Sequence, residues 1–191
     1  MKLYAAALTA FAALSTAPAS AQQLSPAEQN IVAKVKANSA AALGLLERSV
    51  NINSGTMNHA GVREVGAMYR KELEQLGFKT RWIDMPKDMQ RAGHLVATRT
   101  GKQGKRVLML GHLDTVFEPD SPVQKWKLKG DRVSGQGVSD MKGGNVVILE
   151  ALRALHATGA LEGTSIAVMF TGDEENAGEP KAISRGDMVA L

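Results

Sequence analysis

The first half of the chain carries hydrophobic residues at the spacing of two amphipathic helices. From Ser25 to Val50 apolar residues recur every three or four positions, and the Ser-Pro pair at the start is typical of a helix N-terminus. Residues 51–61 contain Asn, Ser and Gly and are expected to form a loop. A second helix is predicted from Val62 to Leu76, because apolar residues again lie on one face and Gly77 follows as a stop signal.

Beyond this point the pattern changes to short apolar runs, which are typical of strands. We predict strands at Lys79 to Ile83, Leu95 to Ala97, Val107 to Leu110 and Ile166 to Phe170. The last two runs are apolar throughout, as in strands of a sheet that is covered on both faces. Between them, Asn145 to Ala157 has helical spacing, so strand, helix and strand form a βαβ unit. This order predicts an α/β fold of the doubly wound type with a mostly parallel sheet.

The first residues have the pattern of a targeting segment. Lys2, an apolar run from Leu3 to Leu14 and the small residues Ala19-Ser20-Ala21 predict a signal peptide over residues 1–21. The alternative is an uncleaved anchor, but the apolar run is shorter than the roughly 20 residues needed to cross a bilayer. We therefore expect a periplasmic or secreted protein without a stable membrane anchor.

The other end of the chain stops without a structural signal. Ser184 to Leu191 has the pattern of a helix start, and no C-cap or turn residue follows it. We interpret residues 22–191 as the N-terminal part of one domain that is truncated at its C-terminus.

Composition narrows the chemistry that this domain can perform. The chain is 44% hydrophobic and 22% charged, which is ordinary for a globular protein. Its net charge of +4 comes with acidic residues interleaved among the basic ones, and aromatic residues make up only 4%, so nucleic-acid binding is not expected. The sequence has no cysteine, which excludes thiolate metal sites and cysteine nucleophiles. Any metal must be held by nitrogen and oxygen atoms.

Three polar clusters follow the predicted strands or precede the predicted crossover helix. His112 and Asp114 come directly after one strand, and Glu174 and Glu175 come directly after another. Asp140 lies in a glycine-rich stretch where the crossover helix begins. Because ligand sites in open α/β sheets gather at the carboxyl ends of the strands, we expect all three clusters to lie at one edge of the sheet.

These residue types are those of a metal-dependent hydrolase. Zinc binds imidazole nitrogen and carboxylate oxygen, and paired zinc ions about 3.5–4 Å apart commonly share a carboxylate, for which Asp140 is the best candidate. Asp114 is placed to hydrogen-bond the far nitrogen of His112 and so fix its tautomer. Adjacent Glu174 and Glu175 point differently, so one can bind metal while its neighbour takes a proton from the attacking water.

Each signal is weak when it is taken alone. Paired glutamates in a loop are usually solvated, and a lone histidine after a strand is more often structural than a ligand. We interpret His59, His94 and His156 as structural on that ground. His112 differs because acidic clusters accompany it in the order and strand context of one site.

Three motifs resemble those of a known family, the dinuclear zinc metallopeptidases. These are His112 to Val116 (HLDTV), Gly135 to Gly144 (GQGVSDMKGG) and Thr171 to Glu175 (TGDEE). The family includes carboxypeptidase G (glutamate carboxypeptidase), acetylornithine deacetylase, succinyl-diaminopimelate desuccinylase, aminoacylase and several dipeptidases, and the chain is most similar to carboxypeptidase G. The resemblance implies a zinc-peptidase-like α/β/α sandwich.

The resemblance also implies a role for each residue of the site. His112 would bind one zinc, Asp140 would bridge two, and Glu175 would bind the other. Glu174 would be the general base and Asp114 would orient His112. The resemblance further implies a cis peptide after Asp140, two more metal ligands downstream of the present sequence, and a homodimer.

The expected function is therefore zinc-dependent hydrolysis of a peptide or N-acyl amide bond. The signal peptide favours an exported glutamate carboxypeptidase-like exopeptidase, since biosynthetic deacylases of the family act in the cytoplasm. Two alternatives stay open: an aminoacylase or dipeptidase of the same family, and a catalytically inactive fragment that lacks the downstream metal ligands.

Overall fold

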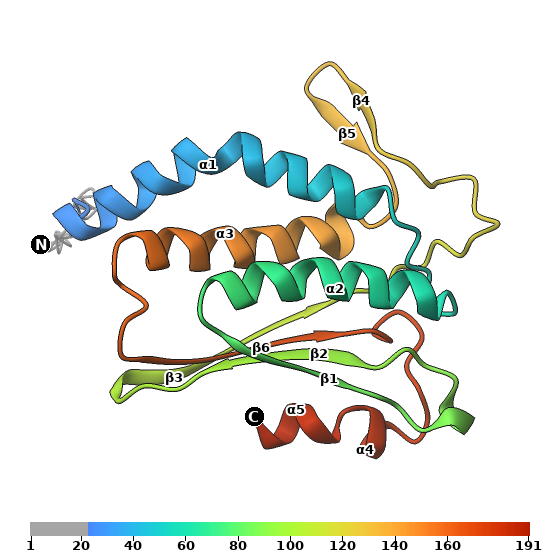
Figure 1. Ribbon diagram of the computed structural model, residues 1–191. Helices are drawn as coiled ribbons and strands as arrows, with labels where there is room; N and C mark the ends of the chain where they lie inside the picture. Colours follow the sequence, from blue (N-terminus) through green and yellow to red (C-terminus); the bar gives the residue numbers. More distant parts are fainter. Residues whose placement is uncertain (1–22) are drawn as a thin grey trace, which may run out of the picture.

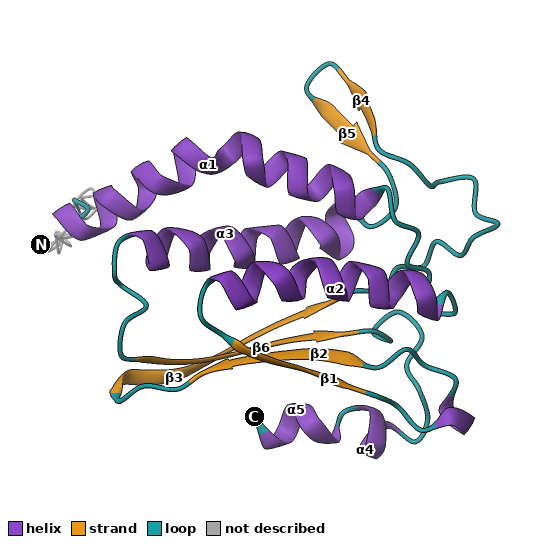
Figure 2. Ribbon diagram, viewed as in Figure 1, coloured by secondary structure: helices purple, strands orange, loops and turns teal. Residues whose placement is uncertain are grey.

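The computed structural model describes residues 23–191, so the predicted signal peptide lies outside the described part (Figure 1). Three long helices lie over one face of a four-stranded sheet, and two short helices lie on the other side (Figures 1 and 2). The helices are α1 (Pro26–Val50), α2 (His59–Gln75), α3 (Gly143–Ala157), α4 (Lys181–Ser184) and α5 (Gly186–Ala190). Within residues 23–191, no helix has both the length and the apolar character required to cross a membrane.

The sheet is mixed, with the strand order β1-β2-β6-β3. Its strands are β1 (Lys79–Ile83), β2 (His94–Arg99), β3 (Gln103–His112) and β6 (Thr164–Thr171). β3 and β6 are parallel because the crossover helix α3 connects them, as the predicted βαβ unit requires. β1 and β2 follow each other without a crossover helix and pair antiparallel, and β2 is also antiparallel to β6. The α/β class is confirmed, but within residues 23–191 only the β3/β6 pair has the parallel arrangement that we predicted for most of the sheet.

Local capping explains where the first two helices begin and end. The Ser25 hydroxyl accepts from the Glu28 amide at 3.3 Å, and the Glu28 carboxylate accepts from the Ser25 amide at 2.7 Å. α2 begins three residues before the predicted Val62, because the Asn58 side chain accepts from the Gly61 amide at the helix start. Gly77 follows α2 with a φ of 80°, the left-handed conformation expected of a glycine stop.

The main core lies between the three long helices and the sheet. Tyr69 and Leu73 of α2, Leu149 of α3 and Phe170 of β6 are fully buried there. The rings of Tyr69 and Phe170 meet edge to face, with 5.6 Å between their centroids. This packing fixes α2 and α3 against the strands that carry the polar clusters.

β3 is less covered than its sequence predicted. Val107, Leu108 and Leu110 are 42% to 46% exposed, whereas the last four residues of β6 are buried. The physical reason is position, since β3 is an edge strand of the described sheet, and only the short helices α4 and α5 lie on the face away from the long helices (Figure 1). The prediction that both faces of the strand are covered is therefore wrong for β3 within the described residues.

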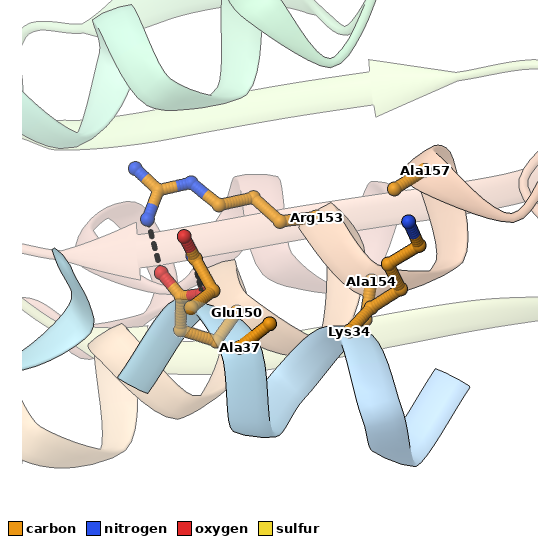
Figure 3. Close-up of a pocket in the computed structure, with 7 residues that line it drawn as sticks. Lys34, Ala37, Glu150, Arg153, Ala154 and Ala157 are labelled. Atoms are coloured by element: carbon orange, nitrogen blue, oxygen red, sulfur yellow. Dashed lines mark hydrogen bonds and ion pairs between the residues drawn. The ribbon is translucent and has the colours of Figure 1, made fainter. Parts of the chain in front are cut away.

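A partly buried cluster of charged side chains connects α1, α2 and α3. Arg153 of α3 pairs with Glu150 one turn earlier and with Glu72 of α2. Asn38 of α1 donates to the same Glu150, beside a cavity of about 270 Å³ that Lys34 also lines (Figure 3). Because each carboxylate in the cluster has a partner, we interpret it as structural.

The sequence pattern missed one element, a short hairpin of β4 (Lys127–Lys129) and β5 (Arg132–Ser134). Its strands are three residues long and rich in charge, so they carry no run of alternating apolar residues. Gly130 at the turn has a φ of 63°, which a glycine adopts without strain. The hairpin projects beyond the end of α1 (Figure 2).

Candidate metal centre

The three polar clusters meet at one edge of the sheet, as predicted. His112 ends β3 and lies opposite Thr171 of the parallel strand β6, so the residues that follow both strands reach the same edge. Asp140 lies in η2 (Val138–Lys142), a kinked turn that leads directly into α3. Ligand atoms of His112, Asp140 and Glu175 all lie within 4.8 Å of one another.

The backbone of η2 departs from regular helix at Asp140, the candidate bridging ligand. Asp140 has φ −120° and ψ 103°, which turns its carboxylate out of the helical path and toward His112. The Asp140–Met141 peptide is cis, as the family resemblance implied. Gly137 precedes the turn with a φ of 65°, and a Cβ there would lie 2.6 Å from Thr115. The glycine therefore permits the close approach of this turn to the segment after β3.

His112 is held by both of its ring nitrogens. Nδ1 lies 3.0 Å from the main-chain oxygen of Asp114, and since a carbonyl only accepts, Nδ1 carries the proton. Nε2 lies 3.0 Å from Oδ1 of Asp140. Burial alone lowers the pKa of His112, but hydrogen bonds to Asp114 and Asp140 outweigh it and raise the pKa to about 9. A cation at the site would take the place of the proton on Nε2.

The carboxylate of Asp114 binds the loop of the paired glutamates as well as lying beside His112. The carboxylate is fully buried. Its Oδ1 lies 3.5 Å from Nδ1 of His112, farther away than the main-chain oxygen of Asp114, which lies 3.0 Å from the same nitrogen. Oδ1 accepts from the Glu174 amide at 3.0 Å, and Oδ2 accepts from the Glu175 amide at 3.0 Å and from the Thr56 hydroxyl at 2.8 Å. Burial raises the pKa of Asp114, but the His112 side chain and then these hydrogen bonds lower it by more. Asp114 therefore fixes the backbone of both glutamates.

The acidic side chains of the cluster point toward solvent beside the histidine. The side chains of Asp140 and Glu174 are 76% and 57% exposed, and Oε2 of Glu174 lies 4.0 Å from Nε2 of His112. Burial, and then the charge of Asp140, raise the pKa of Glu175. A divalent cation would relieve this repulsion, and one imidazole with carboxylates is a donor set that zinc accepts. The residues present fit zinc.

A hollow of about 500 Å³ adjoins the cluster, with Asp140 and Glu175 in its wall. Its other walls are mainly apolar and come from Val116, Phe117, Val123, Val133 and Val138. No lysine or arginine is among the residues that line it. An uncharged part of a substrate would fit beside the candidate metal ligands.

Sequence reasoning did not identify the buried charges that surround the site. Lys142 is fully buried, and burial followed by the charge of Lys125 lowers its pKa to about 7. Asp173 is fully buried too, pairs with Arg185, and accepts from the Gly178 amide at 2.9 Å. Single lysines and arginines are usually solvated, so no sequence signal marked these.

The other histidines lie where a structural role places them. His94 is buried, accepts from the Gly172 amide at 3.1 Å and donates to the Ser184 carbonyl at 2.8 Å. His59 contacts the Gln90 carbonyl, and His156 is exposed on α3. His94 thus supports the loop of the paired glutamates from behind.

Comparisons with known proteins agree with this arrangement. Residues 108–190 match Peptidase family M20/M25/M40. Carboxypeptidase G2 of Pseudomonas sp. (strain RS-16) is 34% identical over 136 residues, which cover 71% of this chain and 32% of that protein. Succinyl-diaminopimelate desuccinylase of Delftia acidovorans is 30% identical over 142 residues, 70% of this chain and 36% of that protein. The chain thus spans about a third of the length of these relatives.

Solved structures show the same fold. Human carnosine dipeptidase 1 superposes with a TM-score of 0.70 at 18% identity, covering 84% of this chain and 37% of that one. The M20 family metallo-carboxypeptidase Sso-CP2 of Sulfolobus solfataricus gives a TM-score of 0.58 at 21% identity, covering 70% of this chain and 31% of that one.

Proposed function

We propose that the whole protein is a zinc-dependent hydrolase of peptide or N-acyl amide bonds, since residues 108–190 match Peptidase family M20/M25/M40. The observation that carries the proposal is the convergence of His112, Asp140 and Glu175 within 4.8 Å at the sheet edge, with Glu174 beside them. An imidazole and clustered carboxylates on three separate segments have no structural need to meet in this way.

We assign the roles of the residues from the family resemblance, and their positions support the assignment. His112 would hold one zinc ion through Nε2, Glu175 would hold a second, and Asp140 would bridge them. When bound, the ions would supply Lewis-acid polarisation of the scissile carbonyl. The Glu174 side chain is 57% exposed, and within residues 23–191 its carboxylate accepts no hydrogen bond, so it can take a proton from the attacking water and pass it to the leaving amine nitrogen. Water adds to the carbonyl carbon, the C–N bond breaks, and an acid and an amine leave.

As the finer function we propose an exported glutamate carboxypeptidase-like metallopeptidase. The similarity to Carboxypeptidase G2 supports the reaction, and the apolar run from Leu3 to Leu14 supports export to the periplasm or beyond the cell. The apolar hollow suits the uncharged part of a small peptide or N-acyl amino acid substrate. By analogy with the family, the whole protein would be a homodimer. An aminoacylase, dipeptidase or desuccinylase activity is the alternative within the same chemistry.

The decisive test is Glu174→Gln in the full-length protein. The amide cannot accept the proton, so turnover should fall by roughly 10²–10⁴-fold, while zinc content measured by atomic absorption stays unchanged. Glu162→Gln makes the same change at an exposed residue before β6 and should leave turnover intact. Retained turnover in Glu174→Gln would refute the general-base role.

Substrate class is tested separately on the full-length wild-type protein. A panel of C-terminal glutamate peptides, N-acyl amino acids, dipeptides and succinyl-diaminopimelate is compared by kcat/KM. Preference for the C-terminal glutamate peptides would support the carboxypeptidase proposal, and preference for another class would replace it with the corresponding alternative. Absence of zinc binding in a calorimetric titration would favour the inactive alternative.

A further inference from the structure

A buried amine lies directly behind the candidate metal centre. Lys142 is the second residue after Asp140 and its side chain has no exposed surface. Its Nζ donates to the main-chain oxygens of Ser49 at 3.0 Å and Ile52 at 2.9 Å. Burying an amine costs free energy unless its N–H groups have acceptors. The two carbonyl oxygens therefore define where the Lys142 amine can lie.

One acceptor, Ser49, lies in the last turn of α1, and the other, Ile52, lies just beyond the end of that helix. Helix C-termini present carbonyl oxygens that lack intrahelical partners and carry partial negative charge, and a buried amine satisfies both requirements. Within residues 23–191 the Asp140 carboxylate has a single hydrogen-bonding partner, His112. Its position therefore depends on the backbone of η2, which Lys142 closes through its amide to the Gly137 carbonyl at 2.8 Å.

The segment that receives Lys142 also reaches the other half of the site. Just beyond Ile52, the Ser54 amide donates to the Gln136 side chain at 3.1 Å, a second link to the loop of Asp140. Two residues further, the Thr56 hydroxyl donates to the carboxylate of Asp114. One stretch of backbone after α1 thus contacts both the supports of Asp140 and the support of the paired glutamates.

We infer that Lys142 is a positioning residue of the metal centre: its amine fastens the turn that carries Asp140 to the end of α1. The Lys142 amine binds main-chain oxygens and not the side chains of the candidate metal ligands. It therefore acts through the backbone of η2. The inference rests on the proposed function, because it requires that the full-length protein bind zinc at this site.

The test is a calorimetric zinc titration of full-length Lys142→Met, with zinc chloride alone as the probe. Methionine fills similar volume without donors, and we expect zinc to bind about 10–100-fold more weakly, as for other groups that orient ligands. The visible spectrum of the cobalt(II) form should also change in Lys142→Met, which reports ligand geometry directly.

Two control variants separate positioning from general destabilisation. Lys125→Met removes an exposed amine from the Asn51 carbonyl at the same helix end, and zinc affinity should stay within about threefold of wild type because this contact does not reach the Asp140 turn. Leu73→Ala weakens the core near the far end of α2 and should lower the melting temperature with affinity similarly preserved. Loss of affinity in Leu73→Ala equal to that in Lys142→Met would overturn the inference.

Should Lys142→Met fail to fold, hydrogen exchange on the wild-type protein decides. Zinc should slow exchange of the amides at 51–54 as well as those at 138–142, because the two segments are linked through Lys142. Protection confined to 138–142 would overturn the inference. A wild-type protein that binds no zinc would instead refute the proposed metal centre itself.

Discussion

Replacing Asp114 with asparagine probes how the site is assembled. The buried carboxylate accepts from the amides of Glu174 and Glu175 on separate oxygens, and from the Thr56 hydroxyl on one of them. An asparagine has only one oxygen. Whichever way its amide group is turned, the NH₂ faces one of the two backbone N–H groups, so a buried donor loses its acceptor.

The expected loss of stability can be worked from these contacts. A buried donor left unpaired costs about 1–3 kcal/mol, and the surviving bonds weaken because their acceptor is no longer charged. We expect Asp114→Asn to lower the free energy of unfolding by about 2–4 kcal/mol. Thr56→Val removes one of the three bonds without opposing two donors, and should cost about 1 kcal/mol. The His112 contact to the main-chain oxygen of residue 114 is retained in both variants.

Urea unfolding of the metal-free full-length protein at neutral pH measures the difference, with equal m-values required for the comparison. Hydrogen exchange at the amides of Glu174 and Glu175 locates it, since these should exchange faster in Asp114→Asn and stay protected in Thr56→Val. If Asp114→Asn is no more destabilising than Thr56→Val, the carboxylate does not hold the glutamate backbone as described.

Two further predictions concern charge. Arg185→Met leaves the carboxylate of Asp173 buried without its cation and should lower the free energy of unfolding by about 3–5 kcal/mol; a loss below 1 kcal/mol in urea unfolding would contradict this. Zinc must displace the proton of His112, whose pKa is raised to about 9, so calorimetric affinity should rise about tenfold per pH unit from pH 6 to 8 and level off above 9. The stability of the metal-free protein should change with pH in the opposite direction. The raised pKa of His112 stabilises the fold at low pH, and this contribution is lost as the pH rises from about 6.5 to 9. Zinc affinity that does not vary with pH would show that His112 is not a ligand.

The fold was predictable where hydrophobic spacing is strong. The helix over Pro26–Val50 and the strand over Lys79–Ile83 agree with the sequence pattern to within a residue. Strand boundaries elsewhere were too short: β3 runs from Gln103, well before the apolar run at Val107. Strand pairing extends into polar residues because backbone hydrogen bonds do not depend on side-chain polarity.

The polar clusters were predictable because topology alone brings them together. His112 and Glu175 follow two parallel strands, and Asp140 precedes the helix that joins those strands, so one sheet edge receives all three. The hydrogen-bonding partners of Asp114 could not be foreseen, since the amides of Glu174 and Glu175 approach it only in the folded sheet.

Two buried side chains behind the candidate metal centre, Asp114 and Lys142, show how the acidic cluster is held in place. Carboxylates that converge without a cation repel one another, and the raised pKa of Glu175 reflects that repulsion together with burial. Their side chains are mostly exposed, so they are held through their backbones: Asp114 binds the amides of the glutamate pair, and Lys142 binds the helix end beneath Asp140. Because the two anchors meet on the segment after α1, displacing that segment should disturb both halves of the site together.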